Sequence, residues 1–133
     1  PPPVNCRQDN KKGGFPMTVT FIWYPKCSTC KKAREWLVQN NVSFEERDIV
    51  TDRPSAQELA QWYRQSGLPL KRFFNTSGLA YRGLGLKDKL PGMAEEEQLA
   101  LLATDGMLVK RPILVTEKGV CPGFQTKVWE TLL

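Results

Sequence analysis

Two cysteines separated by two residues are the part of this sequence best suited to chemistry. Cys27 and Cys30 lie in YPKCSTCKKAREW, residues 24–36, which follows an apolar run and opens a basic, helix-like segment. A Cys-x-x-Cys pair in such a place is compatible with a redox centre, with half of a metal site, or with two structural thiols that happen to be close. The neighbouring residues and the other cysteines distinguish among these interpretations.

The position of the pair at a strand-to-helix junction favours redox chemistry. Unpaired amides and the positive end of the helix dipole stabilise a thiolate on Cys27 and lower its pKa. Lys26 and Lys31 are expected to act in the same direction. Cys30, one turn further on, can close a disulfide with little backbone movement. The chain contains no histidine, so a Cys–His catalytic pair is excluded and activation must come from the dipole and from cations.

The two other interpretations of the pair are weaker. A zinc site needs four ligands, and without histidine only Cys6 and Cys121 remain, neither of them in a second Cys-x-x-Cys motif. We therefore expect no metal. Two structural thiols stay open as an alternative, because a free cysteine often behaves as a small hydrophobic residue. We expect that role for Cys121, with a resolving thiol as its alternative.

A second indication of a site lies far along the chain in KRPILV, residues 110–115. In the β-α-β, β-β-α arrangement of thioredoxin-like folds, a proline that opens the third strand faces the cysteine turn, often with a cis peptide bond. Pro112 suits this place, because proline cannot donate to a strand ladder and tolerates the cis form. Arg111 would then project towards Cys27 as a fixed cation for a thiolate or an oxyanion. The alternative is an exposed arginine beside an ordinary turn proline.

The elements that must position these residues are predicted from the pattern of apolar and polar side chains. Strands are predicted at 18–24, 43–49, 111–116 and 120–124, the last of them weak. Helices are predicted at 28–40, at 54–67 with a Ser55-x-x-Glu58 capping box, at 70–74, 86–90, 94–104 and 125–133. This order predicts an α/β fold with a mixed four-stranded sheet flanked by helices.

Length and composition are those of one ordinary globular domain. The 133 residues carry a net charge of +5 that is interspersed with acidic residues, which argues against direct contact with nucleic acid. No apolar run is long enough to span a membrane. Residues 1–16 are interpreted as a disordered leader or a cloning remnant that includes Cys6, ahead of a domain at 17–133. Sparse cysteines without a secretory signal indicate a reducing, cytoplasmic location, and we expect a monomer.

The chain resembles the arsenate reductase/Spx (ArsC-Spx-MgsR) family in YPKCSTCKKAREWL, FEERDI, a helical insertion, GMLVKRPILV and the closing VCPGF. The resemblance covers nearly all of 17–133. It implies a thioredoxin-like, or glutaredoxin-like, sheet with a helical insertion at about 53–108 between the second and third strands. It also implies that Cys27 is the nucleophile and that Arg111 precedes the cis-proline, Pro112.

The chain departs from the glutaredoxin-coupled arsenate reductases of that family at three places. Their arginine in the insertion is replaced by Asn75, and their C-terminal arginine falls at about Pro122–Gly123. The cations offered in their place are Lys71, Arg72 and Arg82. Those reductases generally lack a second cysteine at the position of Cys30, whereas Spx-like regulators carry the pair as a disulfide switch.

We predict a thiol–disulfide redox protein in which Cys27 attacks a disulfide or a small oxyanion, Cys30 resolves the intermediate and Arg111 stabilises the charge. The predicted substrate-binding residues are Pro112, Lys26, Lys31 and Asn75. No bound cofactor is expected, and the resemblance implies an external reductant, either glutathione with glutaredoxin or thioredoxin. The alternative is an Spx- or MgsR-like redox-sensing transcription regulator that binds the C-terminal domain of the RNA polymerase α subunit. A redox-inactive binding scaffold is the third hypothesis.

Overall fold

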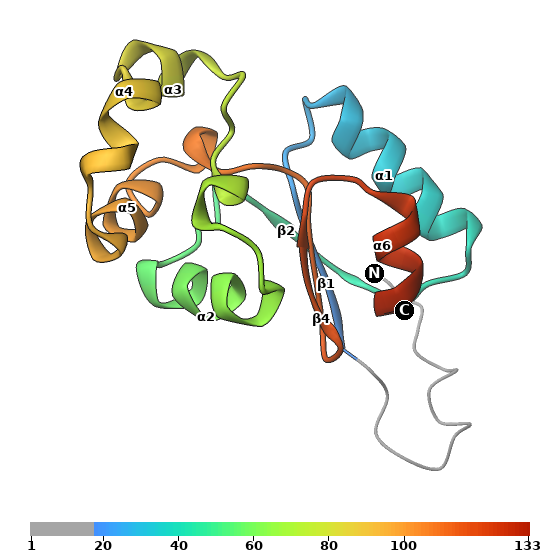
Figure 1. Ribbon diagram of the computed structural model, residues 1–133. Helices are drawn as coiled ribbons and strands as arrows, with labels where there is room; N and C mark the ends of the chain where they lie inside the picture. Colours follow the sequence, from blue (N-terminus) through green and yellow to red (C-terminus); the bar gives the residue numbers. More distant parts are fainter. Residues whose placement is uncertain (1–17) are drawn as a thin grey trace.

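A mixed four-stranded sheet forms the centre of the structure, a computed structural model in which residues 18–133 are described. Its strands are β1 (Val19–Trp23), β2 (Glu45–Asp48), β3 (Ile113–Thr116) and β4 (Gly119–Pro122). They lie in the order β2-β1-β3-β4, with β2 parallel to β1 and the other two pairs antiparallel (Figure 1). The predicted mixed sheet is confirmed.

Two helices cover one face of the sheet. The parallel β1–β2 pair requires a crossover, which α1 (Ser28–Gln39) supplies. The C-terminal helix α6 (Thr126–Leu132) lies beside α1 on the same face (Figure 1). Trp129 of α6 is fully buried and its ring centroid lies 5.9 Å from that of Trp36 in α1. This aromatic contact joins the two helices over the sheet.

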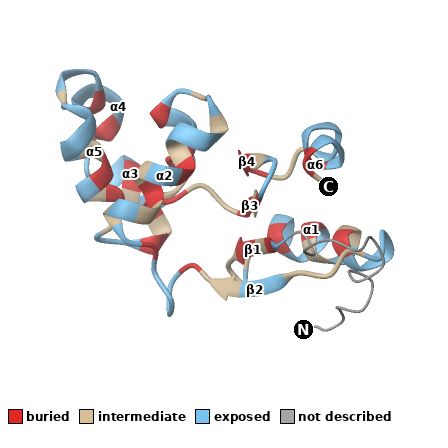
Figure 2. Cartoon of the chain, turned by 90° about the horizontal axis from the view of Figure 1, so that it is seen from below, coloured by how far each residue is buried: buried red, intermediate tan, exposed pale blue. Residues whose placement is uncertain are grey.

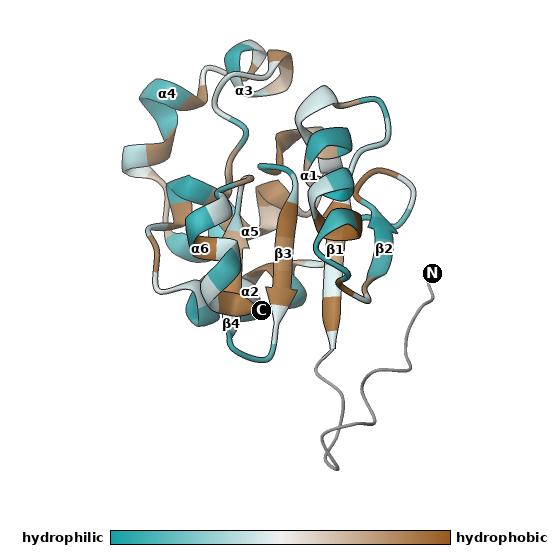
Figure 3. Ribbon diagram, turned by 90° about the vertical axis from the view of Figure 1, so that its right-hand side faces the viewer, coloured by the Kyte–Doolittle hydropathy of each residue, from teal (hydrophilic) through white to brown (hydrophobic). Residues whose placement is uncertain are grey.

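Alternation along the strands divides the core between the two faces. Phe21 and Leu114 pack with α1 and α6, whereas Ile22 and Ile113, their neighbours along the chain, pack with the segment between β2 and β3. Figure 2 shows buried residues on β1, β3 and β4 and only intermediate or exposed ones on the edge strand β2. Figure 3 shows the same contrast as a hydrophobic β3 and a hydrophilic β2.

Short helices fill the segment between β2 and β3, so the predicted insertion is confirmed. They are α2 (Ala56–Ser66), the 3₁₀ helix η2 (Leu70–Phe73), α3 (Leu79–Gly83), α4 (Leu86–Lys89), the 3₁₀ helix η3 (Leu90–Gly92), α5 (Glu95–Leu102) and the 3₁₀ helix η4 (Gly106–Leu108). The predicted capping box opens α2, and Gly67 ends it with a φ of 68°. The sequence analysis missed α3, because its glycine-rich surroundings are typical of a loop.

The middle of the insertion pairs with the segment just before β3. An isolated antiparallel bridge joins Phe74 to Val109. Next to the bridge, the Asn75 amide donates to the Leu108 carbonyl at 2.7 Å, and the Lys110 amide donates to the Phe73 carbonyl at 2.8 Å. We call this pairing of residues 73–75 with residues 108–110 the clasp. It closes the segment that carries α3, α4 and α5 into a loop whose base is fixed by main-chain hydrogen bonds.

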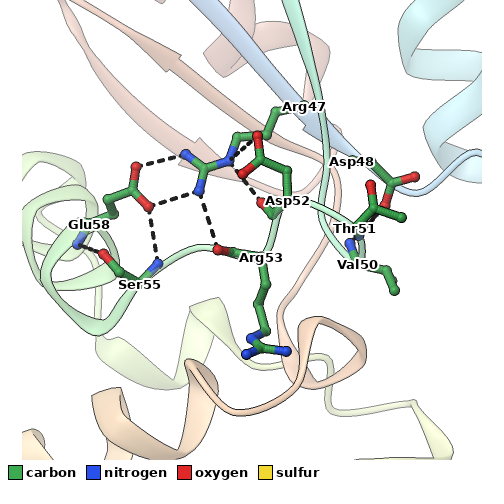
Figure 4. Close-up of polar contacts among 8 residues, drawn as sticks. All are labelled: Arg47, Asp48, Val50, Thr51, Asp52, Arg53, Ser55 and Glu58. Atoms are coloured by element: carbon green, nitrogen blue, oxygen red, sulfur yellow. Dashed lines mark hydrogen bonds and ion pairs between the residues drawn. The ribbon is translucent and has the colours of Figure 1, made fainter.

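A second connection, the Arg47–Glu58 latch, joins β2 to α2. Nη1 and Nη2 of Arg47 donate to the Glu58 carboxylate at 2.7 and 2.8 Å (Figure 4). Its Nε donates to the Asp52 carbonyl at 2.9 Å and its Nη2 to the Arg53 carbonyl at 3.4 Å. The guanidinium carbon lies 5.8 Å from the centroid of the Trp62 ring. The latch therefore satisfies a half-buried arginine on every side.

The elements are shorter than the sequence analysis predicted, since the 43–49 strand narrows to Glu45–Asp48 and the 111–116 strand begins at Ile113. None of the helices in residues 18–133 is both long and apolar enough to cross a membrane. The predicted leader at 1–16, with Cys6, lies outside the described residues.

Candidate functional site

Cys27 occupies the N-cap of α1, at the end of the short turn that follows β1. Its amide donates to the Tyr24 carbonyl at 2.9 Å, and its own carbonyl accepts the Lys31 amide at 3.0 Å. The Cys27 side chain is half-buried, whereas Cys30, one turn later, is fully buried. The Tyr24 amide donates to Cys30 Sγ at 3.5 Å. Both cysteines are free thiols.

The two thiols have opposite acidities. Burial raises the pKa of Cys27, but the main-chain amide and thiol of Cys30, the positive charge of Arg111 and the Thr29 amide together lower it below its ordinary value. Burial raises the pKa of Cys30 to about 12, and the adjacent Cys27 adds to the rise. Cys27 is therefore the thiol that ionises, and Cys30 remains protonated beside it.

Arg111 supplies the cation of the site from the residue before the cis proline. The Arg111–Pro112 peptide bond is cis, as predicted. The guanidinium carbon lies 5.3 Å from the centroid of the Tyr24 ring. Nε and Nη1 are buried and have no hydrogen-bond partner among residues 18–133. Because buried donors are normally paired, these two N–H groups are available to an anion that enters or forms beside Cys27.

Cys27 and Arg111 line a cavity of about 510 Å³. Its lining residues come from the start of α1, the insertion and the loops flanking β3 and β4: Cys27, Thr29, Arg72, Asn75, Ser77, Gly78, Lys110, Arg111, Pro122, Gly123, Phe124 and Gln125. Three of them are cationic and none is acidic. The electrostatic potential of such a cavity favours a negatively charged occupant.

Residues of the insertion build one part of the cavity wall. The clasp fixes the main chain of Asn75, and the Gly78 amide donates to the Asn75 carbonyl at 3.1 Å. Ser77 Oγ lies 3.4 Å from Asn75 Oδ1, within hydrogen-bond distance. A Cβ at Gly78 would come within 2.6 Å of Asn75 Nδ2, so a larger residue there would displace the Asn75 side chain. The polar groups of this wall are therefore held on one tight turn.

The structure brings most of the predicted site residues together. Cys27, Arg111 and Asn75 line the same cavity, and Cys30 hydrogen-bonds with Cys27. Pro112 is buried outside the lining, where its carbonyl accepts the Gly123 amide at 2.7 Å. Its contribution is thus to the backbone that carries Arg111.

Lys26 and Lys31 lie outside the lining of this cavity. Both are exposed, and Lys31 instead lines a separate depression together with Arg34 and Glu46. Among the main causes of the lowered pKa of Cys27, the positive charge is that of Arg111. The electrostatic role of the two lysines stays a prediction. Long lysine side chains at an exposed helix start extend into solvent, whereas Arg111 is held against Tyr24.

Other lining residues were found only in the structure. Of the replacement cations considered, Arg72 lines the cavity, whereas Lys71 and Arg82 do not. Lys110 and Gln125 also line it without having been predicted. Lys110 precedes Arg111 in the sequence, and this position was the one feature from which its place in the cavity lining could have been predicted. Within residues 18–133, no three Cys, His, Asp or Glu side chains form a group able to hold a metal ion.

Comparison with known sequences identifies related chains. The sequence model described as the ArsC family matches residues 22–132. The uncharacterized protein YusI of Bacillus subtilis (strain 168) is 51% identical over 114 residues, which cover 86% of this chain and 97% of YusI. The regulatory protein MgsR of the same organism is 29% identical over 80% of this chain and 82% of its own. The global transcriptional regulator Spx of Streptococcus pyogenes serotype M1 is 28% identical over 80% of this chain and 78% of its own.

Solved structures give a similar result. A Bacteroides fragilis protein described as related to the ArsC family is 54% identical, with a TM-score of 0.85, and the match covers 87% of this chain and 98% of that protein. A possible arsenate reductase from Streptococcus mutans UA159 is 47% identical, with a TM-score of 0.76, and the match covers 81% of this chain and 92% of that one.

Proposed function

Since the chain belongs to the ArsC family, we propose that it is a thiol–disulfide redox protein in which Cys27 is the nucleophile and Cys30 the resolving thiol. One observation carries the proposal: a Cys27 thiol of lowered pKa lies beside a buried Cys30 thiol and shares a cavity with Arg111, two of whose guanidinium nitrogens are buried and unpaired. Such an arrangement supports attack by the Cys27 thiolate as the first step.

Two thiol–disulfide exchanges account for reaction with a substrate disulfide. The Cys27 thiolate attacks one substrate sulfur, forms a mixed disulfide with it and releases the other sulfur as a thiolate. Cys30 then loses its proton and attacks Cys27 Sγ, which forms the Cys27–Cys30 disulfide and releases the second thiolate. Two electrons pass to the substrate, and two protons convert its thiolates to thiols. An external thiol reductant, either glutathione with glutaredoxin or thioredoxin, then returns the protein to the dithiol.

The substrate class follows from the charges of the cavity. Arg72, Lys110 and Arg111 favour a small oxyanion or an anionic disulfide. The family arginine that Asn75 replaces has a counterpart in Arg72 on the same wall. A possible arsenate reductase among the related structures supports an oxyanion as one such substrate. We place the reaction in the cytoplasm, where the cysteines remain reduced.

Turnover with cysteine variants tests this function. We expect the protein, supplied with a thiol reductant, to reduce arsenate or a model disulfide such as oxidised glutathione. Cys27→Ser should lower turnover to the uncatalysed rate, because it removes the nucleophile. Cys30→Ser should accumulate the Cys27 mixed disulfide, detected as an added mass on the intact protein.

The matched controls are Cys121→Ala, which changes a cysteine outside the cavity lining, and Cys6→Ser, which changes a cysteine outside the Cys-x-x-Cys motif. Both are expected to retain turnover. Activity that survives in Cys27→Ser, or an absence of reduction with every substrate and reductant in the unchanged protein, would contradict the proposed reaction.

A transcription regulator that uses the same pair as a sensor is the second candidate, supported by relatives named MgsR and Spx. Its partner would be the C-terminal domain of the RNA polymerase α subunit. Titration of that domain with the reduced and the oxidised protein separates the two functions. Binding that depends on the redox state supports the regulator, and no binding in either state removes it.

A further inference from the structure

Tyr24 contacts all three groups that the proposed reaction uses. Its carbonyl accepts the Cys27 amide at 2.9 Å, and its amide donates to Cys30 Sγ at 3.5 Å. Its ring lies 5.3 Å from the guanidinium carbon of Arg111. Since β1 ends at Trp23, Tyr24 is the first residue of the turn that leads to α1. One residue thus connects the cysteine turn to the loop before β3.

The Tyr24 ring lies against the charged end of Arg111. Nε and Nη1 of Arg111 have no hydrogen-bond partner in residues 18–133, and no carboxylate lines the cavity. A guanidinium can stack on an aromatic face while its N–H groups stay free for a third group. A thiolate or a bound anion at Cys27 needs such free N–H groups as hydrogen-bond donors.

We infer that Tyr24 is a positioning residue whose ring holds the Arg111 guanidinium in the orientation that stabilises a thiolate on Cys27. The inference rests on the proposed function for the role of Cys27 and adds a residue that acts through Arg111. The two main-chain contacts of Tyr24 do not depend on its side chain. A substitution of the side chain therefore isolates the contribution of the ring.

Titration of the Cys27 thiolate tests the inference, followed by thiolate absorbance near 240 nm or by the pH dependence of alkylation at Cys27. In Tyr24→Leu, which keeps an apolar side chain but removes the ring, we expect the acid dissociation constant of Cys27 to fall about three- to tenfold. Tyr24→Phe keeps the ring and should titrate like the unchanged protein. The other titratable groups at the cavity are Cys30, Arg72 and Lys110, which all variants retain.

Two controls assign the effect to Arg111. Phe44→Leu removes a ring that lies 6.0 Å from Arg34, an arginine outside the cavity, and should leave the Cys27 titration unchanged. In an Arg111→Ala background, Tyr24→Leu should cause no further change, because the ring then has no guanidinium to hold.

An unchanged titration in Tyr24→Leu would overturn the inference, including the case in which only the unfolding temperature falls. An equal shift in the Arg111→Ala background would overturn it as well, and so would a Tyr24→Phe variant that behaves like Tyr24→Leu. The titration needs no substrate. A Tyr24-dependent thiolate in a protein that reduces no substrate would therefore retain this inference and remove the proposed function.

Discussion

Arg47 and Arg111 occupy similar surroundings in two different regions and are satisfied in opposite ways. Each guanidinium lies close to an aromatic ring, 5.8 Å from that of Trp62 and 5.3 Å from that of Tyr24. In the latch, every nitrogen of Arg47 donates to an oxygen, two of them to the Glu58 carboxylate. At the cavity, Nε and Nη1 of Arg111 are buried without an acceptor among the described residues.

This difference separates a structural arginine from one that is available for chemistry. A buried donor without a hydrogen-bond partner lowers the free energy of unfolding of the protein. Such a donor is therefore expected mainly where another role requires it. The latch uses its charge to hold the insertion against β2. Arg111 has two buried nitrogens without an acceptor and lowers the pKa of Cys27, which in the proposed function leaves its N–H groups to an incoming anion.

Removal of the Arg111 side chain should have the largest effect on activity. We expect Arg111→Ala to lower kcat/KM by about 100-fold or more, because the charge that forms at Cys27 and on the substrate loses its fixed donor. Steady-state kinetics with the substrate that the turnover assay identifies would measure the loss. Arg111→Lys should recover only part of it, since a lysine lacks the planar guanidinium. The unfolding free energy should stay near that of the unchanged protein, and a large fall would contradict the contrast with Arg47.

Removal of the Arg47 side chain should show the reverse pattern. Arg47→Ala breaks the bidentate pair with Glu58 and two hydrogen bonds to carbonyls, so we expect the unfolding free energy to fall by about 1–3 kcal/mol. Denaturant unfolding would measure this change. The Cys27 titration and kcat/KM should be retained. Arg34→Ala is the matched control, because its exposed pair with Glu46 should contribute less than about 1 kcal/mol.

Lowering the pH should weaken the Arg47–Glu58 latch. This effect is expected to be smaller than those of the Arg111 and Arg47 substitutions. The Arg47 guanidinium and the Ser55 amide lower the pKa of Glu58 from 4.5 to about 2. Because this pKa is depressed in the folded state, the stabilisation is present above pH 4.5 and is lost as the pH falls towards 2. The expected loss is about 1 kcal/mol, since solvent screens the partly exposed carboxylate. Unfolding measured from pH 5 to pH 2 should show a smaller decline in Glu58→Gln, and equal declines would remove this contribution.

The sequence alone predicted the sheet, the insertion and the chemical centre, because these depend on local patterns. Alternation gave the strands, the Ser55–Glu58 box gave the start of α2, and the cysteine spacing gave the two thiols. The part of the cavity that the insertion lines does not follow from local patterns. Arg72 and Asn75 were named from the family resemblance, and only the fold of the insertion brings them to the same cavity as Cys27, across a sequence separation of more than forty residues.

The lysines near the cysteines also show that sequence proximity does not predict which residues surround Cys27. Lys26 and Lys31 are close to Cys27 in sequence, yet their side chains are exposed and a distant arginine supplies the charge. Proximity along the chain does not determine the direction in which a flexible side chain extends. Tyr24 was missed for a related reason, since its ring acquires a role only when Arg111 is brought against it.

The clasp at the base of the insertion makes the far part of that insertion exchangeable. Because Phe74 and Val109 are paired, the backbone at Asn75 and Lys110 is anchored independently of the length of α3, α4 and α5. We therefore expect a change in the length of those helices to leave the Asn75 and Lys110 backbone in place at the cavity.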